Sequence, residues 1–569
     1  MNLLLRLGMP TGVRRRRAGG GFPRGAVIRE AMVVAEIEES FDFIIVGAGS
    51  AGCVLANRLT ASREHRVLLL EAGPDSRHPW LHIPVGFGRL FTDRRFNWCY
   101  VTEPQPHCDD RQVIAPRGKV LGGSSAINGL IYIRGQAADF DHWRQLGNVG
   151  WSYEDVLPYF REAEDNERGA DAFHGAGGPL GVSDVRDRHP LAEAFSEAAQ
   201  QCCYPNNDDF NGVTQEGAGF YQTTTRNGVR SSAAAAYLKP ARRRPNLRIV
   251  SDALATRVLF EGRRATGVEF LVGGETRWAR AAVEVIVASG TFNSPQLLQC
   301  SGLGPAPLLQ SFGIPIIADM PGVGDGLNDH YAGRIMLRCK EPITLNDAVR
   351  GWGGRIAEGL RYVISRRGFL TVSAVTAGCF VRAHPASATP DSQCSIALYS
   401  GDTIGGELHP FPGVTGVCTL LRPESRGYVR IKSADPRQAP AIHPNYLATE
   451  KDRETIVAGT KVLRRIFRAP AMARHITEEI EPGDQCQRDD ELLDFIRRRG
   501  STTYHPVGTC RMGQDAAAVT DERLRVHGFA GLRVVDASIM PAVVSGNTNA
   551  ATIMIGEKGA DMILEDASR

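Results

Sequence analysis

The chain has 569 residues, 43% of them hydrophobic and 23% charged, which is ordinary for a globular protein and excludes a disordered or fibrous chain. Its net charge is +3, but residues 1–31 hold seven arginines and one glutamate, which leaves the other 538 residues at −3. The main body therefore offers no broad basic surface for nucleic acid. No run of 18 apolar residues is present, so no transmembrane segment is predicted.

The first 31 residues have the composition of an unfolded tail. Arg14 to Arg17 form a block that is followed by glycines and Pro23, and not by the apolar stretch of a secretory signal. We expect residues 1–39 to be a disordered tail or the result of a misassigned start, with Met32 as the real first residue. A transit peptide is the alternative. The 12 Cys and 14 His are dispersed without ligand spacing, so no metal site is predicted.

A strand, a glycine-rich turn, a helix and a second strand follow one another from residue 41. Phe41 to Val46 and Val67 to Leu70 have the continuous apolar composition of buried parallel strands. The turn between them reads Gly47-Ala-Gly49-Ser50-Ala51-Gly52, and Glu71 ends the second strand, 19 residues after Gly52. This context predicts a dinucleotide-binding unit, for FAD or NAD.

Each part of this unit has a physical role. Gly47 permits the tight turn, Gly49 lets the backbone approach a pyrophosphate, and Gly52 allows the helix to pack on the strand. The start of the helix offers free N–H groups to the phosphates. Glu71 can accept hydrogen bonds from both ribose hydroxyls, which disfavours a 2′-phosphate.

Three later segments add to this pattern. Arg117 to Asn128 is a second glycine-rich loop, in which Gly122, Gly123 and Ser124 expose backbone N–H groups. Val285 to Ala288 predicts another buried strand, followed by a helix that Pro295 opens and that Asn293 or Ser294 caps. Leu532 to Val535 predicts a strand that runs into Asp536, and an apolar helix is predicted from Ala550 to Leu564.

Four segments together resemble the glucose–methanol–choline (GMC) family of flavoprotein oxidoreductases. They are Gly118 to Asp141, Gly290 to Gly304, Tyr504 to Gly513 and Val535 to Pro541. The resemblance covers about residues 40–565, and within the family the sequence is most similar to bacterial alcohol and choline dehydrogenases.

The resemblance implies an α/β fold, α+β overall. A Rossmann-like FAD-binding domain is built from discontinuous segments, and a substrate-binding cap domain lies over an antiparallel sheet. Residues 40–330 would be mostly FAD-binding and residues 331–500 mostly substrate-binding. Residues 501–569 would carry the catalytic His segment and return to the FAD-binding domain. Arg426 to Lys432 alternates as a strand of the antiparallel sheet would.

The resemblance also implies which residues hold FAD. Adenine would contact the backbone of Ala255 to Val258, and Asn97-Trp98 would approach the flavin. Relatives that attach FAD covalently do so through a His at the position of Ile127, so the FAD is expected to be non-covalent. The expected cofactor-binding residues are Gly47, Gly49, Ser50, Ala51, Gly52, Glu71, Trp98, Gly122, Gly123, Ser124, Asn128, Val258, Asp536, Asn547 and Thr548.

Alcohol oxidation removes a proton from the hydroxyl and a hydride from carbon, and a His side chain can manage the proton near neutral pH. The resemblance singles out His505, as general base or as a cation that stabilises the alkoxide. It pairs His505 with Asn549, which would hydrogen-bond the substrate oxygen. The helix that follows would direct its positive end at the flavin.

These residues predict an FAD-dependent alcohol dehydrogenase that oxidises a primary alcohol and passes electrons to a quinone or another acceptor. A choline dehydrogenase, an oxygen-using alcohol oxidase of the same fold, a flavin-dependent lyase or photodecarboxylase and a non-catalytic flavin-binding module are the alternatives. Choline is disfavoured as substrate because Thr376 stands where choline-active relatives place a Glu. The predicted location is the cytoplasm, either free or at the periphery of the inner membrane, although no amphipathic basic helix stands out in the sequence.

Overall fold

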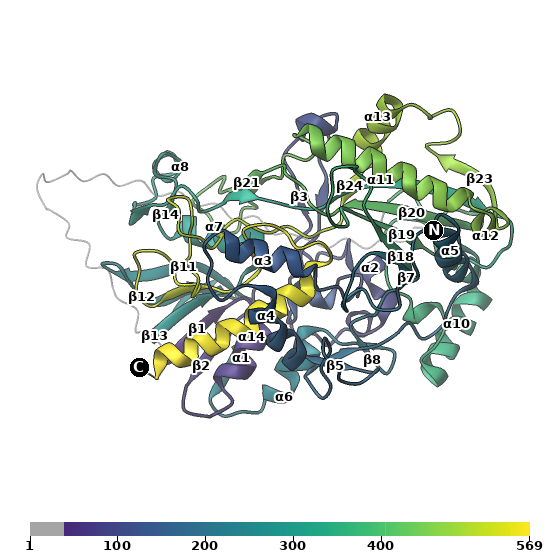
Figure 1. Cartoon of the computed structure of the whole chain (residues 1–569). Helices are drawn as coiled ribbons and strands as arrows, with labels where there is room; N and C mark the ends of the chain where they lie inside the picture. The colour runs from purple at the N-terminus through teal and green to yellow at the C-terminus, as the bar shows by residue number, and fades with distance from the viewer. Residues whose placement is uncertain (1–38, 404, 569) are drawn as a thin grey trace, which may run out of the picture. The chain divides into compact units, whose positions relative to one another are not determined.

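The computed structural model describes residues 39–403 and 405–568. Almost all of the predicted tail, residues 1–38, therefore lies outside the described residues. The described part contains two seven-stranded sheets with helices packed on them, together with five smaller sheets (Figure 1). Among the described residues, none of the helices combines the length and the hydropathy that crossing a bilayer requires.

The first sheet contains the predicted nucleotide-binding strands. Its order is β10 (Leu247–Val250), β2 (Val67–Leu70), β1 (Ser40–Val46), β13 (Glu275–Val287), β12 (Arg264–Val272) and β11 (Ala253–Glu261), and β25 (Leu532–Val534) also pairs with β13. The pairs β10–β2, β2–β1, β1–β13 and β13–β25 are parallel. The strands predicted at 41–46, 67–70, 285–288 and 532–535 are thus confirmed, and all four lie in this sheet.

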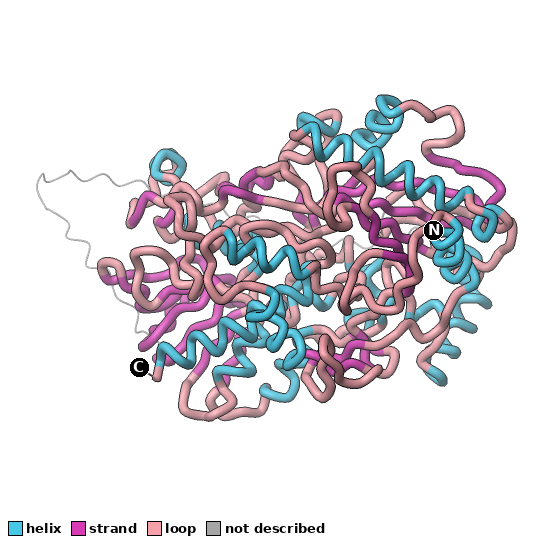
Figure 2. Tube along the Cα trace, viewed as in Figure 1, coloured by secondary structure: helices cyan, strands magenta, loops and turns pink. Residues whose placement is uncertain are grey.

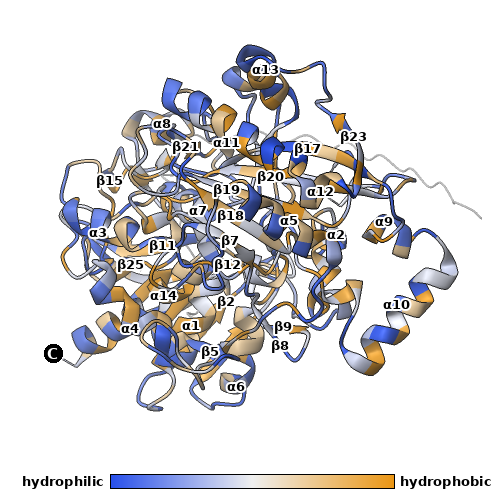
Figure 3. Ribbon diagram, turned by 45° about the vertical axis from the view of Figure 1, so that its right-hand side comes forward, coloured by the Kyte–Doolittle hydropathy of each residue, from blue (hydrophilic) through white to orange (hydrophobic). Residues whose placement is uncertain are grey.

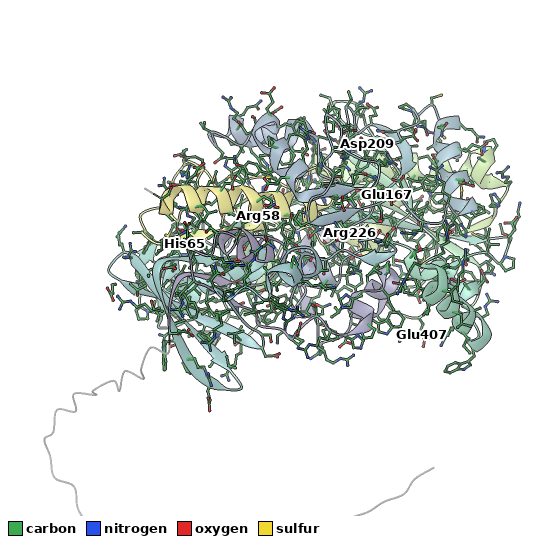
Figure 4. The ribbon with its side chains drawn as sticks, turned by 90° about the horizontal axis from the view of Figure 1, so that it is seen from below. Arg58, His65, Glu167, Asp209, Arg226 and Glu407 are labelled. Atoms are coloured by element: carbon green, nitrogen blue, oxygen red, sulfur yellow. The ribbon has the colours of Figure 1, made fainter. Side chains whose placement is uncertain are left out.

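Two helices from opposite ends of the chain pack on this sheet side by side. They are α1 (Ser50–Leu59), which follows the glycine-rich turn, and α14 (Thr548–Ala567), which contains the predicted C-terminal helix. Gly556 makes the close approach possible, since a Cβ there would lie 3.0 Å from Cα of Ala51. Arg58 of α1 lies beside α14 and forms an ion pair with buried Glu557, at 2.5 Å (Figure 4). Both helices therefore begin at the same end of the sheet.

Helix α7 begins earlier than predicted. It runs over Gly290–Cys300, with Pro295 inside it and not at its start. Proline lacks the N–H that would bond to the carbonyl of Thr291. The hydroxyl of Thr509 donates to that carbonyl instead, at 2.6 Å. A side chain more than 200 residues away thus satisfies the carbonyl that Pro295 leaves free, and the helix tolerates the proline.

The second sheet is antiparallel throughout. Its order is β23 (Ile476–Glu481), β17 (Tyr331–Cys339), β20 (Gly413–Leu420), β19 (Ser392–Ala397), β18 (Ala377–Val381) and β7 (Gly217–Phe220), with β24 (Ser501–Thr502) also paired to β17. Helices α11 (Glu450–Arg468), α5 (Pro190–Gln201) and α13 (Asp489–Arg499) pack on this sheet. Alternate residues of β17 and β20 point away from these helices and form the wall of a cavity.

The strand predicted over 426–432 exists as β21 (Gly427–Arg430), but it belongs to a separate three-stranded sheet with β16 (Asp325–Leu327) and β22 (Ala441–His443). Long loops and short elements connect the sheets (Figure 2). The other helices are α2 (Phe87–Leu90), α3 (Ala137–Gln145), α4 (Tyr153–Ala163), α6 (Lys239–Ala241), α8 (Ala306–Ser311), α9 (Leu345–Ala348), α10 (Trp352–Ser365) and α12 (Pro470–Ala473). The short strands are β3 (Tyr100–Val101), β4 (Ile114–Ala115), β5 (Glu164–Asn166), β6 (Leu180–Val182), β8 (Thr225–Arg226), β9 (Val229–Arg230), β14 (Leu303–Gly304) and β15 (Ala318–Asp319).

Candidate active site

A cavity is lined by residues of both seven-stranded sheets. Val46 and Leu70, the last residues of β1 and β2, line it on one side, and Arg334 of β17 and Thr415 of β20 line it on the other. Ligands of open α/β sheets bind beyond the carboxyl ends of the parallel strands. The cavity lies at that end and extends to the antiparallel sheet, so it has room for a nucleotide on one side and a substrate on the other.

The glycine-rich segments shape the nucleotide side. Gly47 has a φ of +103°, and a Cβ there would lie 2.5 Å from the carbonyl oxygen of Ala288, so only glycine fits this turn. A Cβ on Gly123 would lie 2.7 Å from Cα of Gly49, which shows how closely the second glycine-rich loop approaches the first. A Cβ on Gly49 itself would meet no atom closer than 4.0 Å. The backbone at Gly49 is therefore open to a ligand.

Glu71 is buried at the end of β2 and lines the cavity. One carboxylate oxygen accepts the N–H of Ala48 at 2.9 Å, and the other accepts the N–H of Gly73 at 2.8 Å. Burial raises the pKa of Glu71 to about 7, although the two N–H groups oppose the shift. The backbone bonds fix the carboxyl group, and each oxygen keeps a lone pair for a ribose hydroxyl.

His505 lies in the loop after β24 and is held by a chain of ring contacts. Nδ1 of His505 lies 3.0 Å from Nδ1 of His330, and Nε2 of His330 lies 2.9 Å from the carbonyl oxygen of Leu421. A carbonyl can only accept, so His330 carries its proton on Nε2 and its Nδ1 accepts from His505. Nε2 of His505 is then the unprotonated nitrogen.

The surroundings keep both rings neutral. Burial lowers the pKa of His330 to about 4. Burial, followed by the electrostatic effects of the His330 ring and of the Arg117 charge, lowers the pKa of His505 well below its ordinary value. The backbone N–H of His505 donates to the carboxylate of buried Asp329 at 2.9 Å, which fixes the loop. At neutral pH, His505 therefore presents a fixed ring whose Nε2 can accept a proton.

The two asparagines that precede and open α14 have different partners from those predicted. Nδ2 of Asn547 lies 3.0 Å from Nε2 of His505, whereas Oδ1 of Asn549 accepts the hydroxyl proton of Ser50 at 2.8 Å. Oδ1 of Asn547 is buried and has no hydrogen-bond partner among the described residues. In the structure His505 thus lies beside Asn547 and not beside the predicted Asn549, which bonds instead to Ser50 at the start of α1.

The comparisons with known proteins point to one family. Two family models, both described as GMC oxidoreductase, match residues 41–332 and 423–556. The chain belongs to the GMC oxidoreductase family. It is 44% identical over 529 residues to "Alcohol dehydrogenase [acceptor]" of Pseudomonas putida, covering 92% of this chain and 96% of that protein. It is also 45% identical over 537 residues to the oxygen-dependent choline dehydrogenase of Pseudomonas putida, covering 93% and 94%.

Among solved structures, the fold of this GMC oxidoreductase is similar to a formate oxidase variant of Aspergillus oryzae studied for modification of its FAD. The TM-score is 0.88 at 27% sequence identity, and the match covers 94% of this chain and all of the other. The resemblance found in the sequence and the fold class inferred from it are confirmed, and FAD is the cofactor of this family member.

The residues present fit FAD. Twelve of the predicted cofactor-binding residues line the cavity: Gly47, Gly49, Ser50, Ala51, Glu71, Trp98, Gly123, Ser124, Asn128, Asp536, Asn547 and Thr548. The starts of α1 and α14 also lie there, and the partial positive charge of a helix N-terminus suits a pyrophosphate or a negatively charged ring. The open backbone at Gly49 and the unpartnered Oδ1 of Asn547 are further points for contact.

Three predicted residues do not line the cavity. Gly52 packs against the turn, where a Cβ would lie 1.9 Å from the carbonyl oxygen of Gly47. The N–H of Gly122 donates to the carbonyl of Ala48, and the N–H of Val258 donates to the hydroxyl of Ser301, so neither is free for a ligand. The cavity meets β11 at residues 253–255, so of the stretch 255–258 predicted to contact adenine only Ala255 lines it.

FAD should be released by acid or heat, because the described residues that line the cavity offer no Cys and no His other than His505 as a linking group. Ile127 lines the cavity where a linking His was considered, and of the described residues that line it, none is a Cys and His505 is the one His. The measurement is the flavin content of the supernatant after precipitation of the purified protein. Flavin that stays with the precipitated polypeptide would contradict the expectation.

Sequence reasoning assigned the substrate side of the cavity to residues 331–500 over an antiparallel sheet, but it did not identify the strand residues that form the wall. Its wall is made by one face of the antiparallel sheet, where Arg334 of β17 pairs in register with Val417 of β20, which in turn pairs with Ser395 of β19. The strands are far apart in the chain, and no local motif marks them. Sequence reasoning also did not single out His330. Its place in the Asp329-His330 dipeptide, directly before β17, is the one sequence feature that marks it.

Proposed function

We propose that the protein oxidises an uncharged primary alcohol to an aldehyde and passes the electrons to a quinone or another acceptor that is not oxygen. FAD, when bound, supplies the acceptor for the hydride that the alcohol carbon loses. Nε2 of His505 accepts the hydroxyl proton, because His330 holds the proton of His505 on Nδ1. The amide of Asn547, adjacent to Nε2, orients the substrate oxygen. The observation that supports this role most strongly is the neutral, fixed His505.

Arg334 supports an uncharged substrate. It lines the cavity from β17, and among the described residues its guanidinium forms no ion pair and no hydrogen bond. Its charge acts on the neighbouring phenol of Tyr399. An unpaired cation in the wall disfavours a quaternary ammonium in the same cavity, since like charges repel most strongly where water is scarce.

Thr376 bears less directly on the choice of substrate than Arg334 does, because its side chain does not line the cavity. Thr376 is buried, its backbone pairs with Tyr221 and Ile396, and the cavity is lined instead by its neighbours Ala374 and Val375. Choline remains the second candidate substrate, because of the choline dehydrogenase relatives and because the carboxylate of Asp402 lines the cavity and is 74% exposed. Asp402 faces Arg499 at 3.6 Å, so part of its charge is already compensated.

Removing the charge of Arg334 should shift the substrate preference. For Arg334→Ala we expect kcat/KM for choline, relative to octanol, to rise on the order of tenfold or more, as expected for a lost repulsion at short range. The wild type should prefer butanol, octanol and benzyl alcohol over choline.

Arg338→Ala is the matched control for this substitution. Arg338 lies on the same strand but pairs with Glu478 at 2.7 Å, outside the cavity. Arg338→Ala should leave kcat/KM for choline, relative to octanol, unchanged. A wild-type preference for choline would overturn the proposed substrate.

The electron acceptor is tested separately from the substrate. Reduced enzyme is mixed in a stopped-flow instrument with oxygen or with a soluble quinone, and the rates of flavin reoxidation are compared. The proposal expects the quinone to react faster. Faster reaction with oxygen would instead identify an oxidase of the same fold.

A further inference from the structure

Helix α10 carries an apolar face that no described part of the chain covers. Trp352, Ile356, Leu360, Val363 and Ile364 are 80%, 59%, 56%, 68% and 82% exposed. Their spacing places all five on one side of the helix. The other large apolar residues that are exposed in the described part lie in strands or loops. In Figure 3, α10 lies at the edge of the molecule and shows hydrophobic segments on its ribbon.

The polar side of α10 faces the protein, which is the reverse of an ordinary surface helix. The carboxylate of Glu358 accepts the N–H of Phe369 at 2.7 Å, and Arg361 pairs with Asp187 at 3.3 Å. Tyr362 is buried and donates its hydroxyl proton to the carbonyl of Gly228 at 3.1 Å. These contacts fix the rotation of the helix, so the apolar face points outward as a consequence of the fold.

The charge around this face is positive. Residues 349–368 hold five arginines and one glutamate, a net +4, although residues 32–569 carry −3. Arg355 and Arg366 have no ion pair among the described residues; Arg355 bonds to the carbonyl of Val349, and Arg366 lies over the ring of Tyr362. A second copy of this face would bring like charges together. An apolar face with a tryptophan and flanking arginines suits an anionic lipid surface.

The face also lies beside the cavity. Phe369–Thr371, directly after α10, packs against Pro84–Gly86, which runs into α2. Phe87 and Phe91, at the start and end of α2, line the cavity. A bilayer against α10 would therefore lie close to residues that a substrate or an acceptor can reach.

We infer that α10 docks the protein on the surface of an anionic lipid bilayer, with its five apolar side chains in the interface. In this position the cavity can exchange apolar alcohols and quinone with the membrane, a consequence that rests on the proposed function. The sequence prediction that no amphipathic basic helix stands out is corrected. Gly353, Gly354 and Gly359 interrupt the pattern in the sequence, and the contacts of Glu358, Arg361 and Tyr362 show which side faces out.

The test is co-sedimentation of the full-length, FAD-loaded protein with vesicles. One set contains equal amounts of phosphatidylglycerol and phosphatidylcholine, and the other contains phosphatidylcholine alone. Wild type should bind the anionic vesicles more strongly and lose binding as salt rises. Ile356→Gln combined with Val363→Gln should weaken binding on the order of tenfold or more, since two exposed apolar side chains that would insert into the bilayer are lost.

The matched control is Val149→Gln combined with Val213→Gln, which replaces two exposed valines outside α10. The control should bind vesicles like wild type, and both variants should keep wild-type flavin reduction by a soluble alcohol. Equal vesicle binding by the α10 variant and wild type would overturn the inference. A wild-type dimer that the α10 variant abolishes would also overturn the inference. Vesicle binding that is lost when the chain starts at Met32 would overturn it as well. If a soluble alcohol does not reduce the flavin of the wild-type protein, the proposed function is contradicted but the docking is not.

Discussion

Replacing His505 with Ala should slow the reduction of bound FAD by an alcohol by roughly 10²-fold or more, the scale of a lost acid–base group. The reason is that Nε2 of His505 is the unprotonated nitrogen of a neutral ring, next to the amide of Asn547. FAD should stay bound, because we expect Glu71 and the starts of α1 and α14 to hold it elsewhere in the cavity. The measurement is anaerobic stopped-flow reduction, together with the flavin content of the purified variant.

A second variant separates the proton transfer from the shape of the site. His330→Gln can still donate to the carbonyl of Leu421 but loses the ring that accepts from Nδ1 of His505. The pH dependence of the rate of flavin reduction in this variant should differ from that of wild type. In wild type the low pKa of His505 keeps the base neutral, so reduction should not slow as the pH falls from 8 to about 6.5, where an ordinary His is half protonated. For the first variant, a rate of flavin reduction equal to that of wild type would show that His505 has no part in the mechanism.

Replacing Asn547 with Ala should slow flavin reduction on the order of 10- to 10³-fold, as for one lost donor at a reacting oxygen. Asn549→Ala should leave that rate near wild type and instead weaken FAD retention by up to about tenfold, because it loses the bond to Ser50. Asn547→His, which can still donate a hydrogen bond, should be better tolerated than Asn547→Leu.

The two asparagine variants are each other's control, since they remove the same amide from positions two residues apart. Reduction rates come from anaerobic mixing with an alcohol, and FAD dissociation constants from titration of the apoprotein. If Asn549→Ala slows reduction and Asn547→Ala does not, the assignment taken from the structure is wrong.

The sequence predicted best the features that are local and have an apolar signature. Strand β2 matches its predicted bounds of Val67 to Leu70, and β1 starts one residue before Phe41, because both are buried on two faces. The choice between Asn547 and Asn549 could not be made from spacing. Side chains that are two residues apart in a helix point in directions about 200° apart, so a small error in register changes which asparagine contacts His505.

Other site residues depend on contacts that span the chain. Arg334 enters the cavity through the register of β17 with β20, about 80 residues away. Val258 follows a register shift in β11 between Ala255 and Arg257, and its N–H donates to the hydroxyl of Ser301. The outward side of α10 follows from the contact of Tyr362 with Gly228. None of these pairings leaves a local pattern.

The central claim is that an alcohol gives its hydride to FAD in this cavity while His505 takes the proton. The most direct measurement is a single turnover without oxygen, in which the FAD-loaded protein is mixed with octanol, and flavin absorbance and aldehyde are followed together. The account predicts that the flavin bleaches and that aldehyde forms in an amount equal to the flavin reduced. Flavin that stays oxidised with octanol, butanol and benzyl alcohol, or bleaching without aldehyde, would contradict it.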